Sequence, residues 1–577
     1  MSVHSRYGGG VYPNVDAMFK RVGISPSWGY FSKLSMSETD ITSAAALHGV
    51  PVLVTSEPAA VGSASAPRFA GATTASAEGS LLRTVFSFPV MLATFLVGRV
   101  FYEARAFYVD PDLWWHIKVG QDILTTHHWP TSDPFSYTVA GNPWMAYEWL
   151  GDVLFGAVAR WGGLLGLEIL LFALASAVML ALYAYATLRS GNSKAGFVSS
   201  GLLCSLAFAS FNLRPQMLGY LFLVLTLIAL ERFRQGKQRS AWFLPVLFLI
   251  WINAHGSWVI GLGVLFVFLA SGLVEFRWGG IQGRRWSSAE RMRLEAISLL
   301  CLTAIPLTPY GTRLAAYPFT VASNLPLNVG NILEWQPMPF NTLGGKLFLA
   351  AVLAFFLAQM VTPLTLRLSE VVLLFGGIVM ACLHVRFLLL FVPFAAPIFA
   401  VVLARWLPPY DRKKDHPVLN AVLMAVAVVA IVRYFPTNAG LEKIVARVFP
   451  VRAVEYLRQH PVPGPMFNNY GYGGYLVGKL PEQKVFIDGR GDLYEDAGVF
   501  GEYLELAQLK PAAFEVLRAH NIQSCLLDSK EPLATVLAVH PDWDKRYSDG
   551  VSVLYVRRYP LYSRDTPTER APRSPKE

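Results

Sequence analysis

The chain has 577 residues, of which 54% are hydrophobic and 15% are charged. Soluble proteins carry about 25% charged residues, and the apolar residues of this chain come in blocks of about 20, the length that crosses a bilayer. The composition excludes an ordinary soluble enzyme and predicts a polytopic α-helical membrane protein. The net charge of +10 does not indicate a nucleic-acid partner, because the basic residues concentrate in short loops that set membrane topology.

The two ends of the chain differ in composition from the rest. Residues 1–80 are rich in Ser, Ala, Gly and Thr, and residues 561–577 are polar and contain prolines. Such segments bury too little apolar surface to fold by themselves. We expect a disordered cytoplasmic tail at 1–80 and a second disordered tail at 561–577.

Between the tails, eleven apolar segments are expected to cross the membrane as helices. They lie at about 82–102, 163–187, 195–212, 216–231, 240–254, 257–275, 295–309, 346–365, 369–384, 387–405 and 418–434. Basic residues gather in the N-terminal tail and in alternate loops, which places those segments on the cytoplasmic side. We therefore expect a transmembrane domain at 81–440, with the loop at 103–162 and the C-terminal region on the outer side.

The loop at 103–162 holds the strongest candidates for chemistry. It opens with Asp110-Pro-Asp112, and either carboxylate is a candidate general base. Asp112 is also a plausible cap for the helix that follows, which favours Asp110 slightly. His116 lies one helical turn after Asp112 and is a candidate substrate-binding residue. Asp110, Asp112 and His116 together are a possible site for a divalent cation such as Mg²⁺ or Mn²⁺.

Two further carboxylates of this loop have different interpretations. Asp133 lies between Ser132 and Pro134, which is typical of a turn. Glu148 opens an amphipathic stretch at 148–160, which predicts a helix lying in the membrane interface. It is a candidate second catalytic carboxylate, or else an acid favoured by the dipole of that helix.

Polar residues at the outer ends of the predicted spans are candidate substrate-binding residues. They are Arg214, Asn253, His255 and Arg386, and Glu334 in the loop segment 331–337 is a further candidate that an ordered loop structure would explain equally well. Arginine suits bidentate contacts to a phosphate, although a basic side chain can also reach the interface without any function. Glu334 is followed by Trp335, and an aromatic face beside a polar edge suits a sugar.

The C-terminal region at 445–560 is less apolar and predicts a small α/β domain on the outer side. We expect helices at about 451–459, 499–508, 511–519 and 531–539, strands at 465–468, 484–488 and 524–528, and a hairpin around 548–550. The glycine-rich segment 468–475 is expected to be a loop–strand junction. Asp488 and Arg490 are expected to pair structurally.

With these residues together, the chain resembles the GT-C superfamily of polytopic glycosyltransferases, which use polyprenyl-phosphate sugars and carry an acidic motif in the first outer loop. More closely, it resembles a set of bacterial membrane proteins that share short motifs. In this chain the motifs are Asp112–His116, Asp133–Ser136, Glu148–Leu150, Arg214–Gln216, Asn253–Ser257 and Asp488–Arg490. The resemblance covers about 82–560.

The resemblance implies an enzyme of the bacterial inner membrane that transfers a sugar from a polyprenyl-phosphate donor to a glycan, lipid or protein acceptor of the cell envelope, at the outer face. One departure matters: the commoner members carry an Asp-Glu pair where this chain has Asp110-Pro-Asp112, so the choice of base stays open. The alternatives are a polymerase or ligase of envelope polysaccharide, a transporter, and a non-catalytic scaffold.

Overall fold

The computed structural model describes residues 81–104 and 110–559. The tails expected at 1–80 and 561–577 lie outside these residues. The chain divides into two compact units at Thr84 and Val85, and every element described below belongs to the second unit.

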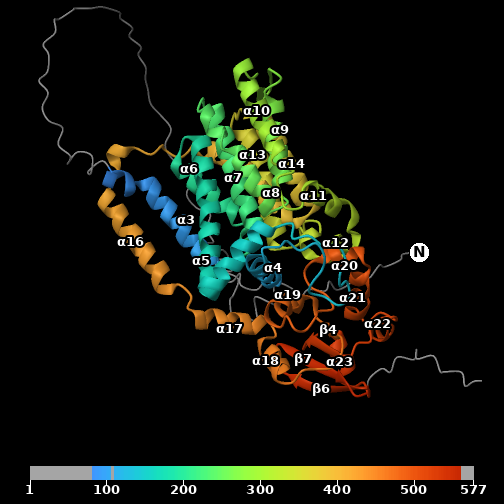
Figure 1. Cartoon of the computed structure of the whole chain (residues 1–577). Helices are drawn as coiled ribbons and strands as arrows, with labels where there is room; N and C mark the ends of the chain where they lie inside the picture. The colour runs from blue at the N-terminus through green and yellow to red at the C-terminus, as the bar shows by residue number, and fades with distance from the viewer. Residues whose placement is uncertain (1–80, 105–109, 560–577) are drawn as a thin grey trace, which may run out of the picture. The chain divides into compact units, whose positions relative to one another are not determined.

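Helices make up most of the second unit as far as residue 448 (Figure 1). They are α3 (Phe88–Ala104), α4 (Leu113–Thr126), α5 (Trp149–Ser190), α6 (Ser193–Cys204), α7 (Gln216–Arg234), α8 (Leu244–Ala254), α9 (Trp258–Ser271), α10 (Ser288–Thr303), α11 (Thr312–Asn324), α12 (Pro326–Asn331), α13 (Leu343–Val361), α14 (Leu368–Leu383), α15 (Leu388–Leu403), α16 (Pro417–Tyr434) and α17 (Asn438–Val448). Between α9 and α14, the short strands β1 (Phe276–Trp278), β2 (Ile281–Gly283) and β3 (Leu366–Arg367) form a small sheet.

Five of the described helices are long and apolar enough to cross a membrane. They are Trp149–Ser190, Gln216–Arg234, Leu343–Val361, Val385–Leu403 and Pro417–Tyr434, and the shorter helices α9 and α14 are also apolar. The chain is therefore a multi-pass membrane protein. The total of eleven spans stays a prediction, because several of the expected spans form helices of only 11 to 17 residues.

The sequence predicts an interfacial helix at 148–160 and a separate span at 163–187, and α5 contains both. Its 42 residues are interrupted at Gly163, where φ is +56° and ψ is −148°. This conformation is open mainly to glycine, since a side chain would clash there. The chain thus changes direction between the two arms, 149–162 and 164–190, which lets the first arm carry Glu148 at its start.

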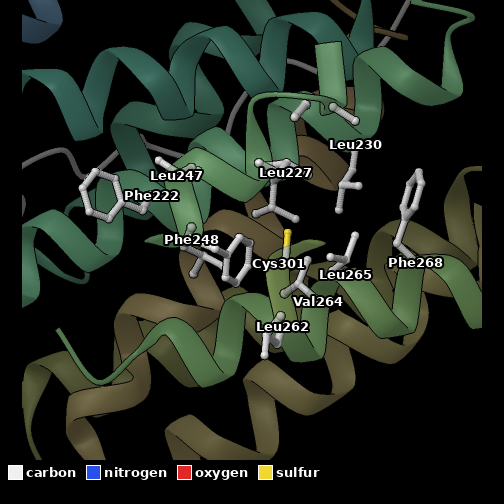
Figure 2. Packing of buried hydrophobic residues seen from close by; sticks show 14 of the residues in the cluster. Phe222, Leu227, Leu230, Leu247, Phe248, Leu262, Val264, Leu265, Phe268 and Cys301 are labelled. Atoms are coloured by element: carbon white, nitrogen blue, oxygen red, sulfur yellow. The ribbon is translucent and has the colours of Figure 1, made fainter. Parts of the chain in front are cut away.

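A large apolar cluster holds the middle of the bundle together. Figure 2 shows side chains of α7, α8 and α9 meeting there, among them Phe222, Phe248 and Leu265, with Cys301 of α10 between them. Trp251 of α8 is fully buried in the same cluster. Large buried aromatic side chains contribute strongly to packing energy, so this cluster positions both ends of α7.

The C-terminal region mixes short helices with a four-stranded sheet. The helices are α18 (Val451–Gln459), α19 (Tyr470–Lys479), α20 (Gly491–Asp496), α21 (Val499–Ala507), α22 (Ala513–Ala519) and α23 (Pro532–Leu537). The strands β4 (Met466–Asn468), β5 (Ser524–Asp528), β6 (Trp543–Ser548) and β7 (Ser552–Arg557) lie in the order β4-β5-β7-β6. β4 and β5 are parallel, and the other pairs are antiparallel. The expected hairpin around 548–550 is confirmed as β6–β7.

Two expectations for this region are wrong. The segment 484–488 is no strand, because Val485 forms a single bridge to Ser136 of the loop at 103–162 and Phe486 donates its backbone N–H to the side chain of Asn468. The glycine-rich segment 468–475 is largely helix α19, which packs against α4 (Figure 1). A Cβ at Gly474 would lie 2.2 Å from the carbonyl oxygen of Pro111. The glycines therefore serve close helix packing and not a loop.

Candidate functional site

The site is built around the guanidinium of Arg214, which stands in the loop before α7. Its Nε donates to Asp110 Oδ2. Its Nη2 lies 3.0 Å from Asp112 Oδ2, and its Nη1 lies 3.2 Å from Glu334 Oε1. Three carboxylates from two distant parts of the chain thus converge on one arginine, and all four residues are among those that the sequence singles out.

Asp110 and Asp112 occupy different environments. Asp110 is buried, and its Oδ1 accepts the backbone N–H of Asp112 at 2.9 Å, so both of its oxygens are bonded within the protein. The side chain of Asp112 is 18% exposed. Asp112 stands at the N-cap of α4 but makes no capping hydrogen bond, and its Oδ1 accepts instead from the indole of Trp115 at 3.3 Å. The capping interpretation of Asp112 is therefore wrong, and Asp110 is the structural member of the pair.

Burial raises the pKa of Asp112 to about 6, although the neighbouring Arg214 guanidinium acts in the opposite direction. The charge of Asp110 adds to the increase. A carboxylate with a pKa near the working pH is suited to accepting a proton and then releasing it. These environments favour Asp112 over Asp110 as the candidate base.

A second cluster adjoins the first and is centred on Glu148. Its Oε1 lies 3.3 Å from His255 Nε2, and its Oε2 lies 3.7 Å from His116 Nε2. The other ring nitrogen of His116 lies 2.6 Å from Asp152 Oδ1, and Nδ1 of His255 lies 2.8 Å from the hydroxyl of Ser257. Glu148 stands at the N-cap of α5 without a capping hydrogen bond, so its side chain faces the histidines.

Burial shifts the pKa values in this second cluster in the directions that favour the uncharged forms of the side chains. It raises the pKa of Glu148 to about 7, although His116, Arg214 and Arg386 act to lower it. It lowers the pKa of His116 and that of His255, to about 3. The two histidines are therefore uncharged at neutral pH, and Glu148 exchanges its proton near pH 7.

A small cavity opens beside His255, which contacts Glu148, and the side chain of Arg386 lies at its edge. It is lined by Gln216, Gly219, Tyr220, Leu223, Trp251, His255, Ser257, Ile260, Arg386, Phe387 and Leu390. The Arg386 guanidinium stacks on the indole ring of Trp335, with its carbon 4.1 Å from the ring centroid. Within the part of the chain that the structure describes, no carboxylate lies within ion-pair distance of Arg386. The positive charge of Arg386 is thus available to an anion.

Asn253 does not line this cavity. Its Oδ1 accepts from the indole of Trp149 at 2.8 Å, and its Nδ2 donates to the carbonyl oxygens of Leu249 and Leu307. These bonds use the whole side chain, which is buried. Asn253 holds the start of α5 in place, and the structure does not support contact with substrate.

The arrangement does not suit the metal site that the sequence leaves open. Arg214 contacts both Asp110 and Asp112, so a guanidinium occupies the place where a cation would bind. Between residues 81 and 559, outside the gap at 105–109, no three His, Cys, Asp or Glu side chains are grouped as a metal would require.

A third cluster of charged residues, formed by Arg490, Asp488 and Asp133, stabilises the loop at 103–162 and lies outside the candidate site. Arg490 makes two hydrogen bonds to Asp488, at 2.8 and 2.7 Å, and its Nη1 lies 2.7 Å from Asp133 Oδ1. All three side chains are fully buried. Asp133 also accepts the backbone N–H of Ser136 at 2.9 Å, which confirms the expected turn. Arg490 thereby ties the C-terminal region to the loop that carries Asp110 and Asp112.

Several residues near the site were not expected from the sequence. Asp152 orients His116, and Gly489 lies against Asp112. Trp335 was expected beside a sugar, but its contact with Arg386 was not foreseen. Asp152 had a signal in the sequence, because it lies one helical turn after Glu148 in the same amphipathic stretch. Nothing in the sequence indicated that Gly489 lies close to Asp112, because this contact depends on how α19 and α20 pack.

Substituting Gly489 by alanine is expected to destabilise the protein by about 1–3 kcal/mol, the usual cost of overpacking. The new Cβ would lie 1.6 Å from Asp112 Oδ1, so the carboxylate must move. The backbone conformation of Gly489 is open to alanine, because its φ lies outside the left-handed region. Gly550→Ala is the matched control, since nothing lies within 4 Å of its Cβ. Equal thermal midpoints of the two variants in detergent would contradict the placement of Gly489.

Comparison with known proteins finds loose likenesses to solved structures of membrane proteins. No family model and no curated protein matches the sequence. Among solved structures, the oligosaccharyltransferase AglB of Archaeoglobus fulgidus, tethered to an acceptor peptide, is 11% identical, with a TM-score of 0.47 over 82% of this chain and 74% of that chain. ArnT of Cupriavidus metallidurans is 14% identical in the apo state, with a TM-score of 0.46 over 84% and 98% of the two chains. ArnT bound to undecaprenyl phosphate gives a TM-score of 0.37 at 15% identity and the same coverage. A likeness this loose does not fix an activity.

Proposed function

We propose that the protein is a membrane glycosyltransferase, which transfers a sugar from a polyprenyl-phosphate donor to an acceptor hydroxyl of the cell envelope. The observation that carries the proposal is the contact of Asp112 with Arg214, two residues before Gln216, which lines a cavity together with Arg386. A proton acceptor and a phosphate partner are the two groups that such a transfer needs. The acceptor is a glycan, a lipid or a protein.

The reaction can be written with the groups present. The acceptor hydroxyl oxygen forms a bond to the anomeric carbon of the donor sugar while the bond from that carbon to the phosphate oxygen breaks. The phosphate leaves with the electron pair, and the hydroxyl proton passes to the Asp112 carboxylate. General-base catalysis of this kind contributes about 10²–10⁴-fold. Asp110 holds Arg214 and the start of α4, and so positions Asp112.

Arg386 is the proposed partner of the donor phosphate. It stacks on Trp335 and has no ion pair to a carboxylate among the described residues. The cavity wall next to it is apolar, with Leu223, Ile260 and Leu390, which suits the first isoprene units of a lipid. Arg214, by contrast, is already neutralised by three carboxylates, and its role is to hold Asp112.

Glu148 and His255 stand between the base and the phosphate partner. Nδ1 of His255 accepts the backbone N–H of Ser257 at 3.0 Å, so the single proton of the uncharged imidazole lies on Nε2. Nε2 lies 3.3 Å from Glu148 Oε1, and the proposed role of His255 is to orient this carboxyl group. Glu334 and Trp335 at the opposite edge are the proposed contacts to the sugar.

The proposed side of the reaction is the outer face of the bacterial inner membrane. What supports it is the distribution of basic residues in the sequence, which assigns the loop at 103–162 and the region at 445–560 to the outer side. The region at 445–560 is the proposed outer domain. In the structure, Arg490 and α19 bind this region to the loop.

Loss of Arg386 is expected to weaken donor use more than catalysis. In Arg386→Gln the KM for a polyprenyl-phosphate sugar should rise about tenfold or more, because a charge-assisted contact to phosphate is lost. Arg313→Gln is the control, since Arg313 is an exposed arginine that contributes nothing to the proposed site. The measurement is release of labelled sugar from synthetic donors. An unchanged KM in Arg386→Gln would refute the assigned phosphate partner.

The rate of transfer is expected to fall as the pH drops below about 6. The pKa of Asp112 is raised to about 6, so the carboxylate is ionised and able to accept a proton above this pH and is protonated below it. A rate limited by this group falls about tenfold per pH unit on the acid side. Initial rates between pH 8 and pH 5 at saturating donor check the prediction. A flat profile over this range would remove Asp112 from the role of base.

One observation favours a second candidate, a polysaccharide ligase that works without a carboxylate base. His255 and Arg386 both line the cavity, and those two residue types suffice for such an enzyme. The two candidates differ in their response to Asp112→Asn, which a ligase of this kind would tolerate.

A further inference from the structure

A second cluster of charged residues lies at the other end of α7. The first residues of this helix line the cavity next to Arg386, and its last residues, Glu231 and Arg234, line another cavity. With 19 residues at about 1.5 Å each, the helix is roughly 28 Å long. This length is close to the thickness of the hydrocarbon core. The second cluster therefore lies at the membrane surface opposite to Asp112.

The two carboxylates of the cluster already have partners. Glu231 accepts from both terminal nitrogens of Arg367, and Glu370 accepts from Nε and Nη2 of Arg189. Both carboxylates are therefore held by a forked arginine contact, which is the strong geometry for such pairs. Neither carboxylate therefore neutralises the charge of a third arginine.

Arg234 is that third arginine. Its Nη2 donates to the hydroxyl of Ser369 at 3.0 Å, and its Nε is buried without a hydrogen-bond partner. The guanidinium stacks on Phe268 and Trp286, at 4.5 and 5.4 Å from the ring centroids. Across the described residues, no carboxylate lies within ion-pair distance of it. A largely buried cation without an anion is costly, so the site lacks one negative charge.

The cavity next to Arg234 combines this cation with an apolar wall. Leu227, Leu230, Val264, Phe268, Leu373 and Phe394 line it. Arg234 and Ser369 offer N–H and O–H donors at its polar edge. A ligand that satisfies both parts has an anionic head with oxygen acceptors and a hydrocarbon chain.

The surface around the cavity suits a lipid better than a free anion. Exposed basic residues surround this end of the helices, namely Arg232, Lys237, Arg239, Arg277, Arg284 and Arg285. Trp278 stands among them with 79% of its surface exposed. Basic side chains and an exposed tryptophan are typical of protein surfaces that meet anionic lipid headgroups.

We propose that Arg234 and Ser369 bind the phosphate of an anionic membrane lipid, whose acyl chain occupies the cavity between α7, α9 and α14. The lipid supplies the negative charge that the cluster lacks, and it links α7 to α14 at the surface opposite to the candidate active site. This site is separate from the proposed sugar transfer and stands without it.

The test is lipid retention by the full chain, measured by native mass spectrometry during titration with phosphatidylglycerol or phosphatidylcholine. We expect the wild type to bind phosphatidylglycerol in preference to phosphatidylcholine, and Arg234→Gln to bind it about tenfold more weakly. Arg518→Gln removes the same charge from an exposed position in α22, away from this cavity, and should stay within about twofold of the wild type.

A second variant keeps the test decisive if Arg234→Gln does not fold. Leu373→Trp fills the cavity and leaves Arg234 in place, and it should also lose the bound lipid. Retention of phosphatidylglycerol by both variants at the wild-type level would overturn the proposal. Equal occupancy by inorganic phosphate at the same concentration would overturn the lipid as the source of the anion.

Discussion

Replacing Asp112 by asparagine is expected to reduce sugar transfer from a polyprenyl-phosphate donor by about 10²–10⁴-fold, while the protein still folds. The amide keeps the size of the side chain and can still accept from Trp115, but it cannot take a proton from the acceptor hydroxyl. The measurement is single-turnover release of labelled sugar by purified protein. The effect should fall on kcat and leave donor binding nearly unchanged.

Two controls separate catalysis from structure. Asp122→Asn removes an exposed carboxylate from the same helix, where it pairs only with Lys118, and should leave the rate unchanged. Asp110→Asn weakens the hold on Arg214, and we expect a loss of thermal stability together with a loss of rate. Equal turnover in Asp112→Asn and the wild type would reject Asp112 as the base and favour the ligase alternative.

Replacing Arg490 by methionine is expected to destabilise the protein by about 3–5 kcal/mol, the usual cost of removing one partner from a buried ion pair. The change leaves the Asp488 and Asp133 carboxylates buried without their cation, and it removes the stacking on Trp144 at 4.7 Å. The thermal midpoint in detergent should drop accordingly. Arg518→Met, at an exposed position, should leave it unchanged.

A rescue variant identifies the cause of this loss. If the buried charges are responsible, Asp133→Asn and Asp488→Asn added to Arg490→Met should recover part of the midpoint, because both unpaired charges disappear. A midpoint that drops further with each added change would mean that the carboxylates contribute through their hydrogen bonds, such as that from Ser136 to Asp133, and would contradict the charge explanation.

Much of the candidate site could be anticipated from residue types and their order. Asp110, Asp112, Arg214 and Glu334 were each singled out as polar groups on the side of the membrane that the sequence predicts to be the outer one, and the structure brings them into direct contact. Polar groups at span ends are costly to keep unless they meet partners. This cost makes them visible in a sequence before any contact is known.

The choice between neighbouring carboxylates could not be anticipated. Asp110 and Asp112 are two residues apart and chemically alike, and the capping argument favoured Asp110. Only the structure shows that Asp110 accepts the backbone N–H of Asp112, while Asp112 caps nothing and remains partly exposed. The sequence likewise suggested Asn253 as a substrate-binding residue, and only the structure shows that its side chain makes three hydrogen bonds within the protein.

The sequence by itself determined the membrane class and predicted the loop at 103–162 and most members of the candidate site, because apolar block length and the placement of charge are local properties of the chain. The tertiary structure decided which groups touch. The fit of Gly474 against Pro111 and of Gly489 against Asp112, and the unpaired charge of Arg234, depend on packing between segments hundreds of residues apart. Such contacts leave no periodic or compositional trace, since the residues involved are ordinary glycines and arginines until a partner stands next to them.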